Sequence, residues 1–134
     1  MKKFLAFIMM LLPVAAWAFT GKVEIDGIYY NLTTKANVAE VTKGDVPYNV
    51  DVISIPSIVV YEGVTCNVTS IGEGAFQNCK NLKSITCPSK LALIPKACFE
   101  GCGNLKEIIF NERLEMIASS AFKGISADKI KIPA

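Results

Sequence analysis

The sequence contains no histidine among its 134 residues. Without an imidazole, the chain cannot form the serine–histidine or cysteine–histidine pairs of hydrolases, and it cannot bind a metal ion through histidine. The cysteines and carboxylates that are present lack the spacing of a metal site or of an acid–base pair. We therefore expect a protein that is not an enzyme and that holds no metal ion and no cofactor.

A strong excess of charge is also missing. The chain has 14 lysine and arginine residues against 12 aspartate and glutamate residues, a formal net charge of +2. Lys2 and Lys3 lie in a segment that we expect to be removed, which leaves 12 basic residues and 12 acidic ones. Proteins that bind nucleic acids carry a basic footprint, so the sequence predicts no nucleic-acid partner.

The N-terminus has the three parts of a secretory signal peptide. Lys2 and Lys3 supply the positive charge, Phe4–Leu12 is an uninterrupted apolar run, and Ala16-Trp17-Ala18 has the small residues that signal peptidase requires. We expect residues 1–18 to be a signal peptide that is cleaved after Ala18, leaving a mature chain of 116 residues.

Two other ways to hold the chain at a membrane fit the sequence less well. The apolar run is too short to span about 30 Å of hydrocarbon, and no cationic stop follows it. The first cysteine is Cys66, which is far from the cleavage site that a lipoprotein would need. We therefore expect a protein that is secreted or lies at the cell surface or in the periplasm, with no membrane insertion after cleavage.

The second half of the chain repeats itself with a period of 23 residues. The repeated columns are Ile71, Ile94 and Ile117; Ala75, Cys98 and Ala121; Phe76, Phe99 and Phe122; and Cys79, Cys102 and Ile125. This period lies within the range of about 20–29 residues that is typical of leucine-rich repeats. Single units of this kind cannot bury their apolar faces, whereas stacked units can.

Each unit is expected to contain a short strand followed by a return limb that forms a single helical turn. The strands are expected at Leu82–Pro88, Leu105–Asn111 and Ile130–Pro133, with alternate residues facing inward. Asn78, Gly101 and Gly124 share a column at which a tight corner would require a positive φ. The predicted fold class is therefore α/β, a short leucine-rich-repeat solenoid of about three 23-residue repeats.

The repeat also resembles a known family. Ile71–Ile85, with the sequence IGEGAFQNCKNLKSI, is similar to the repeat of the BspA-like leucine-rich-repeat family. Ile53–Ser57 and Val68–Gly72 resemble the lead-in of those proteins, and the likeness extends from Val23 to Pro133. The resemblance implies a secreted or surface protein, and for some members it implies adhesion to host proteins and to other cells.

The first half of the mature chain is expected to form an antiparallel β-rich cap over residues 19–70. Alternating runs flank Asp26-Gly27 and Glu62-Gly63, which predicts two hairpins. Val38–Thr42 and Val50–Ile55 alternate in the same way. Such a cap would cover the open end of the repeats at 71–134, and because no linker separates the two parts we expect one cooperative unit.

Two interpretations of the five cysteines stay open at this point. All five are expected to be small buried hydrophobic residues, or one pair forms a disulfide in the oxidising compartment. Cys79 and Cys102 would lie about 4.8 Å apart on adjacent coils. That separation allows a bond, although parallel side chains disfavour it.

The candidate binding residues are the outward positions of the predicted strands: Ser84, Thr86, Glu107, Ile109, Lys129 and Lys131. The leading hypothesis is a non-catalytic module that recognises a protein, either a host extracellular protein or a bacterial surface protein. The alternative is a structural cap-and-repeat fragment, or a solenoid subunit without its own ligand. The unpaired edge of Ile130–Pro133 would then favour weak self-association through the C-terminal end.

The export signal generates a first prediction. N-terminal sequencing of the secreted protein should begin at Phe19, because the charged start, the apolar run and the small residues at Ala16 and Ala18 agree on one cleavage site. Secreted protein that retains Met1 would contradict both the export route and the charge balance given above.

Overall fold

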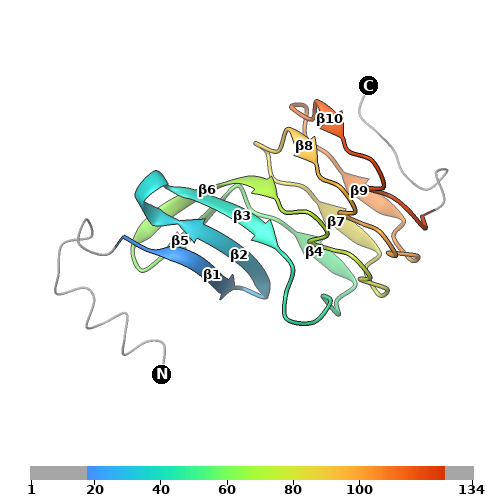
Figure 1. Ribbon diagram of the computed structural model, residues 1–134, viewed down its shortest axis with the longest axis horizontal. Coiled ribbons are helices and arrows are strands. Elements are labelled where there is room, and N and C mark those ends of the chain that lie inside the picture. The colour runs from blue at the N-terminus through green and yellow to red at the C-terminus, as the bar shows by residue number, and fades with distance from the viewer. Residues whose placement is uncertain (1–17, 126–134) are drawn as a thin grey trace.

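The computed structural model describes residues 18–125 (Figure 1). Residues 1–17 of the predicted signal peptide, the predicted strand Ile130–Pro133, and Lys129 lie outside the described residues. The strands are β1 (Thr20–Ile25), β2 (Ile28–Thr33), β3 (Val38–Thr42), β4 (Val52–Ser54), β5 (Ile58–Tyr61), β6 (Val64–Ile71), β7 (Ser84–Thr86), β8 (Leu93–Ile94), β9 (Glu107–Ile109) and β10 (Met116–Ile117). A 3-10 helix, η2 (Thr34–Ala36), joins β2 to β3.

These strands form three sheets. The N-terminal sheet has the order β1-β2-β3-β6-β5, a second sheet has the order β4-β7-β9, and β10 pairs with β8. Figure 1 shows the N-terminal sheet at one end of the molecule and the repeats stacked beside it.

The structure confirms both predicted hairpins. β1 pairs with β2 through Ile25 and Ile28, and β5 pairs with β6 through Tyr61 and Val64. Both turns have two residues with a positive φ, 50° and 84° at Asp26-Gly27 and 50° and 81° at Glu62-Gly63. Such turns match the right-handed twist of the flanking strands.

The N-terminal sheet is not purely antiparallel, because β3 pairs with β6 in parallel. Parallel neighbours need a long crossover between them, and here the crossover passes through the second sheet. After β3 the chain forms β4, which pairs in parallel with β7, and it returns as the β5–β6 hairpin. Strand pairing therefore does not divide the molecule at residue 70, since β4 belongs with the repeats.

The pairing of the later strands confirms the 23-residue period. In the second sheet Ser84 lies opposite Glu107 and Ile85 lies opposite Ile108. On the other side of the coil, Ile94 lies opposite Ile117. Each pair is separated by 23 positions, so one coil is stacked on the next in the register that the sequence indicates.

The return limbs are not helical, and the α/β label is not confirmed for the described residues. They run through successive turns in which Cys98 N donates to Pro95 O, while Phe99 N donates to Ala121 O of the next coil at 2.8 Å. Left-handed residues interrupt each limb, at Ala97 (φ 57°) and Gly101 (φ 79°) in one coil. Because alternate amides bond to the next coil, a continuous helical ladder cannot form. Ile94 and Ile117, two members of the repeated isoleucine column, lie on the short strands β8 and β10.

An aromatic column runs through the core. Phe76 stacks on Phe99 with ring centroids 5.6 Å apart, and Phe99 stacks on Phe122 at 5.7 Å. Tyr48 extends the column towards the N-terminal sheet, with its ring 5.3 Å from Phe76. Its hydroxyl donates to Thr42 O at 2.6 Å and accepts a bond from Tyr29 N at 2.9 Å. The two parts of the molecule thus share one core.

The five cysteines are free thiols and all are buried: Cys66, Cys79, Cys87, Cys98 and Cys102. Cys102 Sγ donates to Phe76 O at 2.9 Å. Burial raises the pKa of Cys87 to about 12, and it also raises the pKa of Cys98. Burial likewise raises the pKa of Tyr48 to about 12. The structure therefore shows the cysteines as small core residues, as the first interpretation expected.

The aromatic column generates a second prediction. Phe99→Ala should lower the free energy of unfolding by about 3–5 kcal/mol, the usual cost of truncating a buried aromatic residue. Phe99 has a ring stacked on each side and is fully buried. The matched control is Phe122→Ala, which removes a half-buried member of the same column and should cost less. Denaturant melts of both variants measure the difference, and an effect of Phe99→Ala within about 0.5 kcal/mol of wild type would contradict this packing.

The buried thiols generate a third prediction, that the protein loses stability in alkali. Cys87 keeps its proton in the folded state up to a pKa of about 12, whereas an ordinary thiol ionises near pH 8.5. The stabilisation that Cys87 gives the folded state is therefore complete below pH 8.5, and it is lost as the pH rises towards 12. The expected slope is about 1.4 kcal/mol per pH unit for each such thiol.

Urea melts between pH 8 and pH 11 measure this slope. Cys87→Ala removes one of the titrating thiols. It should therefore reduce the slope of the free energy of unfolding against pH by the amount that the release of one proton contributes. A free energy of unfolding that stays constant over this range would show that the thiols ionise in the folded protein.

Candidate functional site

The outward residues of β7 and β9 lie side by side on the solvent face of the second sheet. Ser84 and Thr86 flank the buried Ile85, and they are half-exposed. Glu107 and Ile109 flank the buried Ile108 in the same way, and both are exposed. The alternation is that of a strand with one face in the core, and it places four predicted site residues on one surface.

The structure adds a third strand to this surface. β4 presents Val52 and Ser54 outward on either side of the buried Ile53. Its register places Val52 opposite Ser84 and Ser54 opposite Thr86. We call the outward residues of the three strands the recognition face: Val52, Ser54, Ser84, Thr86, Glu107 and Ile109.

Sequence reasoning missed Val52 and Ser54 for a physical reason. Val52 is 32 positions before Ser84, whereas the repeats are separated by 23 positions, so comparison of the repeats did not include β4. The alternation of Val50–Ile55 indicated a strand but not its sheet. Lys131 and Lys129, which were expected on the third coil, lie outside the described residues.

Polar contacts connect neighbouring strands of the recognition face. Ser84 Oγ donates to Glu107 Oε1 at 3.1 Å, across two adjacent coils. At the start of β4 and β7, Lys83 Nζ lies 3.7 Å from Asp51 Oδ2. This ion pair is exposed, and exposed pairs of this kind add little stability.

The face combines two apolar side chains with hydroxyls and one acid. Val52 is 64% exposed and Ile109 is 47% exposed, at opposite corners of the face. The described residues contain no group of three or more cysteine, aspartate or glutamate side chains that is arranged to hold a metal ion. The face is suited to contact with another molecule, because aliphatic groups that exclude water lie beside groups that form hydrogen bonds.

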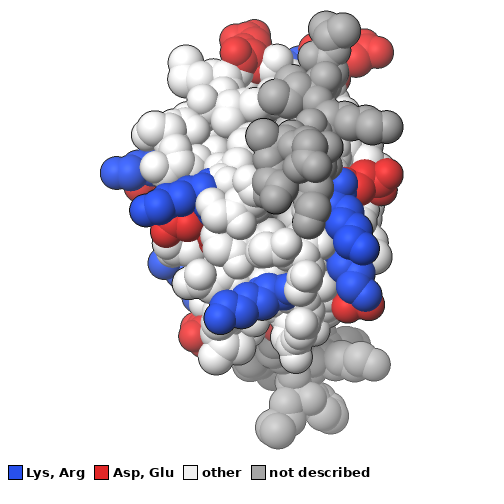
Figure 2. Space-filling view, turned by 90° about the vertical axis from the view of Figure 1, so that its right-hand side faces the viewer, with Lys and Arg blue, Asp and Glu red and all other residues white. Residues whose placement is uncertain are grey.

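Charges elsewhere on the molecule are mixed in sign. Figure 2 views the end of the molecule at which the repeats lie, and on its visible part basic and acidic side chains are interspersed.

Over residues 18–125, no helix is long and apolar enough to cross a membrane.

Comparison with protein families gives one match over most of the repeats. Residues 51–134 match a family model described as "BspA type Leucine rich repeat region (6 copies)". The matched segment begins next to β4, in agreement with the pairing of β4 with the repeats. No curated protein matches the chain.

Several solved structures share the fold. A leucine-rich repeat protein from Bacteroides ovatus is 31% identical with a TM-score of 0.60, and the match covers 77% of this chain and 33% of that one. A leucine-rich cell surface protein from Faecalibacterium prausnitzii is 24% identical with a TM-score of 0.65, covering 81% of this chain and 29% of that one. A leucine-rich repeat protein from Bacteroides capillosus is 18% identical with a TM-score of 0.67, covering 85% of this chain and 99% of that one.

This chain thus spans about a third of the length of the first two proteins. The family match covers more than half of the chain, and the protein from Bacteroides ovatus exceeds 30% identity over most of it. The chain belongs to the BspA-type leucine-rich-repeat family.

Proposed function

We propose that the protein is a secreted, non-catalytic recognition module of the bacterial cell surface, and that it binds a protein partner through the recognition face. The observation that carries this proposal is the alignment of outward side chains on β4, β7 and β9 in one register. Stacked repeats present such aligned positions as a continuous binding surface. The description of the Faecalibacterium prausnitzii protein as a cell surface protein supports the location.

The proposal includes the finer organisation of the chain. The signal peptide directs export and is cleaved after Ala18. The N-terminal sheet acts as the cap of the repeats, and two contacts support this. Tyr48, in the connection after β3, packs on Phe76, and Gly72 N, at the start of the repeats, donates to Val41 O of β3 at 2.7 Å. About three repeats follow, the last of them including Lys129 and Lys131.

Binding by one copy of this face is weak. Three strands about 4.8 Å apart form a patch only on the order of 15 Å across, whereas a standard interface buries about 800 Å² on each partner. The face also lacks the aromatic or arginine side chains that dominate most interfaces. The expected single-site affinity is roughly micromolar or weaker, and useful adhesion arises when many copies act together.

The alternative function is structural, with contacts between copies in place of a foreign partner. The exposed Val52 and Ile109 favour it, since two aliphatic side chains on a flat sheet can also pack against another copy. Sedimentation separates the two functions, because a structural unit self-associates as its concentration rises without any partner.

The recognition face generates a fourth prediction. A partner captured from host extracellular or bacterial surface proteins should bind the double variant Val52→Glu/Ile109→Glu at least tenfold more weakly, because both changes place charge at the two apolar contacts. The matched control is Leu93→Glu/Met116→Glu. This pair is also apolar and exposed, but it lies on the adjacent strands of the β8–β10 sheet.

Monovalent titration by calorimetry measures both variants. The control should bind within about twofold of the wild type, a change well below 1 kcal/mol. Nanomolar binding that survives Val52→Glu/Ile109→Glu would show that the partner is held elsewhere.

A further inference from the structure

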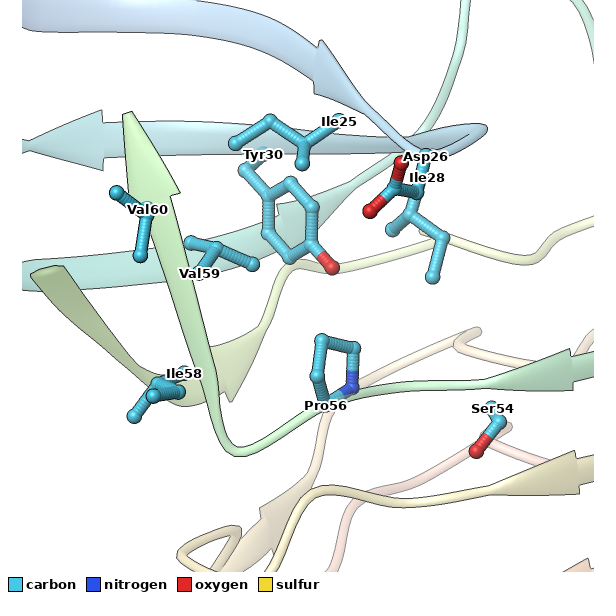
Figure 3. A pocket seen from close by; sticks show the side chains of 9 residues that line it. All are labelled: Ile25, Asp26, Ile28, Tyr30, Ser54, Pro56, Ile58, Val59 and Val60. Atoms are coloured by element: carbon cyan, nitrogen blue, oxygen red, sulfur yellow. The ribbon is translucent and has the colours of Figure 1, made fainter. Parts of the chain in front are cut away.

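A cavity of about 480 Å³ opens beside the N-terminal sheet, and Ser54 of the recognition face is among the residues that line it. Ile25 and Asp26 of the first hairpin line one side, and Pro56 and the start of β5 line the other. Figure 3 shows the side chains of Ile28, Tyr30 and Val59 around the same space. This volume lies within the range of ligand sites, which is about 300–1,000 Å³.

The cavity lies between the two outer strands of one sheet. β1 and β5 are the edges of the five-stranded sheet, yet residues of both line the cavity. At the other end of these strands Phe19 contacts Tyr61, with ring centroids 5.0 Å apart. The sheet therefore curls until its edges meet at one end, and the edges separate at the cavity.

Backbone groups of β5 are available at this edge. Tyr61 and Val64 flank a two-residue turn and form a hydrogen-bonded pair. Along antiparallel strands, hydrogen-bonded pairs alternate with pairs that form no hydrogen bonds. Ser57 O follows this alternation, since it accepts a bond from Val68 N at 2.9 Å. The N–H and C=O groups of Ile58 and Val60 therefore point away from β6, and no other described strand pairs with them.

A buried hydroxyl also points into the cavity. Tyr30 is only 1% exposed, and its hydroxyl forms no hydrogen bond with any described residue, whereas the equally buried hydroxyl of Tyr48 forms two. Figure 3 shows the Tyr30 oxygen directed towards the space beside Pro56. Buried polar groups almost always have a partner, either in the protein or in ordered water, so this hydroxyl offers a hydrogen-bonding position to a ligand in the cavity.

We propose that the cavity binds an extended peptide segment that adds to the edge of β5. The backbone of the peptide would pair with the free groups of Ile58 and Val60, and one of its polar groups would bond to the Tyr30 hydroxyl. Its apolar side chains would contact Ile28 and Val59, as in other complexes formed by strand addition. The Asp26 carboxylate at the rim favours a peptide with a cationic residue at that end.

A single segment fits this place better than a second copy of the sheet. β1 forms the opposite wall of the cavity, so a partner that approached as a folded sheet would meet Ile25 before it reached β5. An extended segment presents only its backbone and alternate side chains, and it can occupy the space between the two edges.

The test uses a probe peptide and the full secreted chain. The probe is an acetylated and amidated pentapeptide of alternating threonine and valine that ends in lysine, and binding is followed by amide chemical shifts. The expected result is a saturable shift at β5, at the turn after β1 and at Tyr30, with a Kd in the millimolar range or below. The control peptide carries an N-methyl group at its central residue, which removes one N–H donor, and it should bind at least tenfold more weakly.

Protein variants test the same contacts. Val60→Pro removes the N–H of an edge position without breaking a bond to β6, and it should abolish binding, whereas Val60→Thr retains that N–H and should bind within twofold of the wild type. Tyr30→Phe removes only the hydroxyl and should weaken binding several-fold while leaving the unfolding midpoint unchanged or raised. The absence of any shift at millimolar peptide would overturn the proposal. Equal shifts with the N-methylated peptide would also overturn it, since they would indicate an apolar pocket without strand addition.

Discussion

The structure depends on one constraint, that each coil bonds through its backbone to the next at a fixed offset of 23 residues. This register brings identical side-chain types into contact along the stack, so that Phe76, Phe99 and Phe122 form a column of nearly parallel rings. The same register directs the amides of the return limbs to the neighbouring coil, as from Phe76 N to Cys98 O at 3.0 Å. A core of this kind can be built from small thiols and single phenylalanines, because the phenylalanine rings of successive coils pack on one another.

Sequence reasoning predicts the parts of this structure that local patterns determine. Repeat spacing predicted the strand register, the Asp26-Gly27 and Glu62-Gly63 dipeptides predicted both hairpins, and alternation predicted which side of β7 and β9 faces out. The return limbs were predicted wrongly as helical turns. Their conformation is decided by hydrogen bonds to the next coil and by left-handed residues such as Ala97, a residue type that gives no local sign of a positive φ.

The position of β4 could not be predicted from the sequence either. Its alternating residues are compatible with either sheet, and only tertiary packing assigns it to β7. The cavity was also missed, since it requires the curl of the N-terminal sheet. The curl brings Ile25 of β1 and Ile58 of β5 to the same cavity, although they are 33 positions apart, and it brings Phe19 against Tyr61, which is 42 positions away.

The segment from β4 to β5 connects the two surfaces. Val52 and Ser54 belong to the recognition face, and Ser54, Pro56 and Ile58 line the cavity. Ile55 N donates to Thr86 O at 3.0 Å, and Ser57 O accepts from Val68 N at 2.9 Å, so the segment is bonded to both sheets through residues two positions apart. Because the buried Ile53 and Ile55 also anchor it in the core, a shift of β4 relative to β7 would displace the wall of the cavity. The crossover that makes the N-terminal sheet a mixed sheet is thus also the element that sets the geometry of both surfaces.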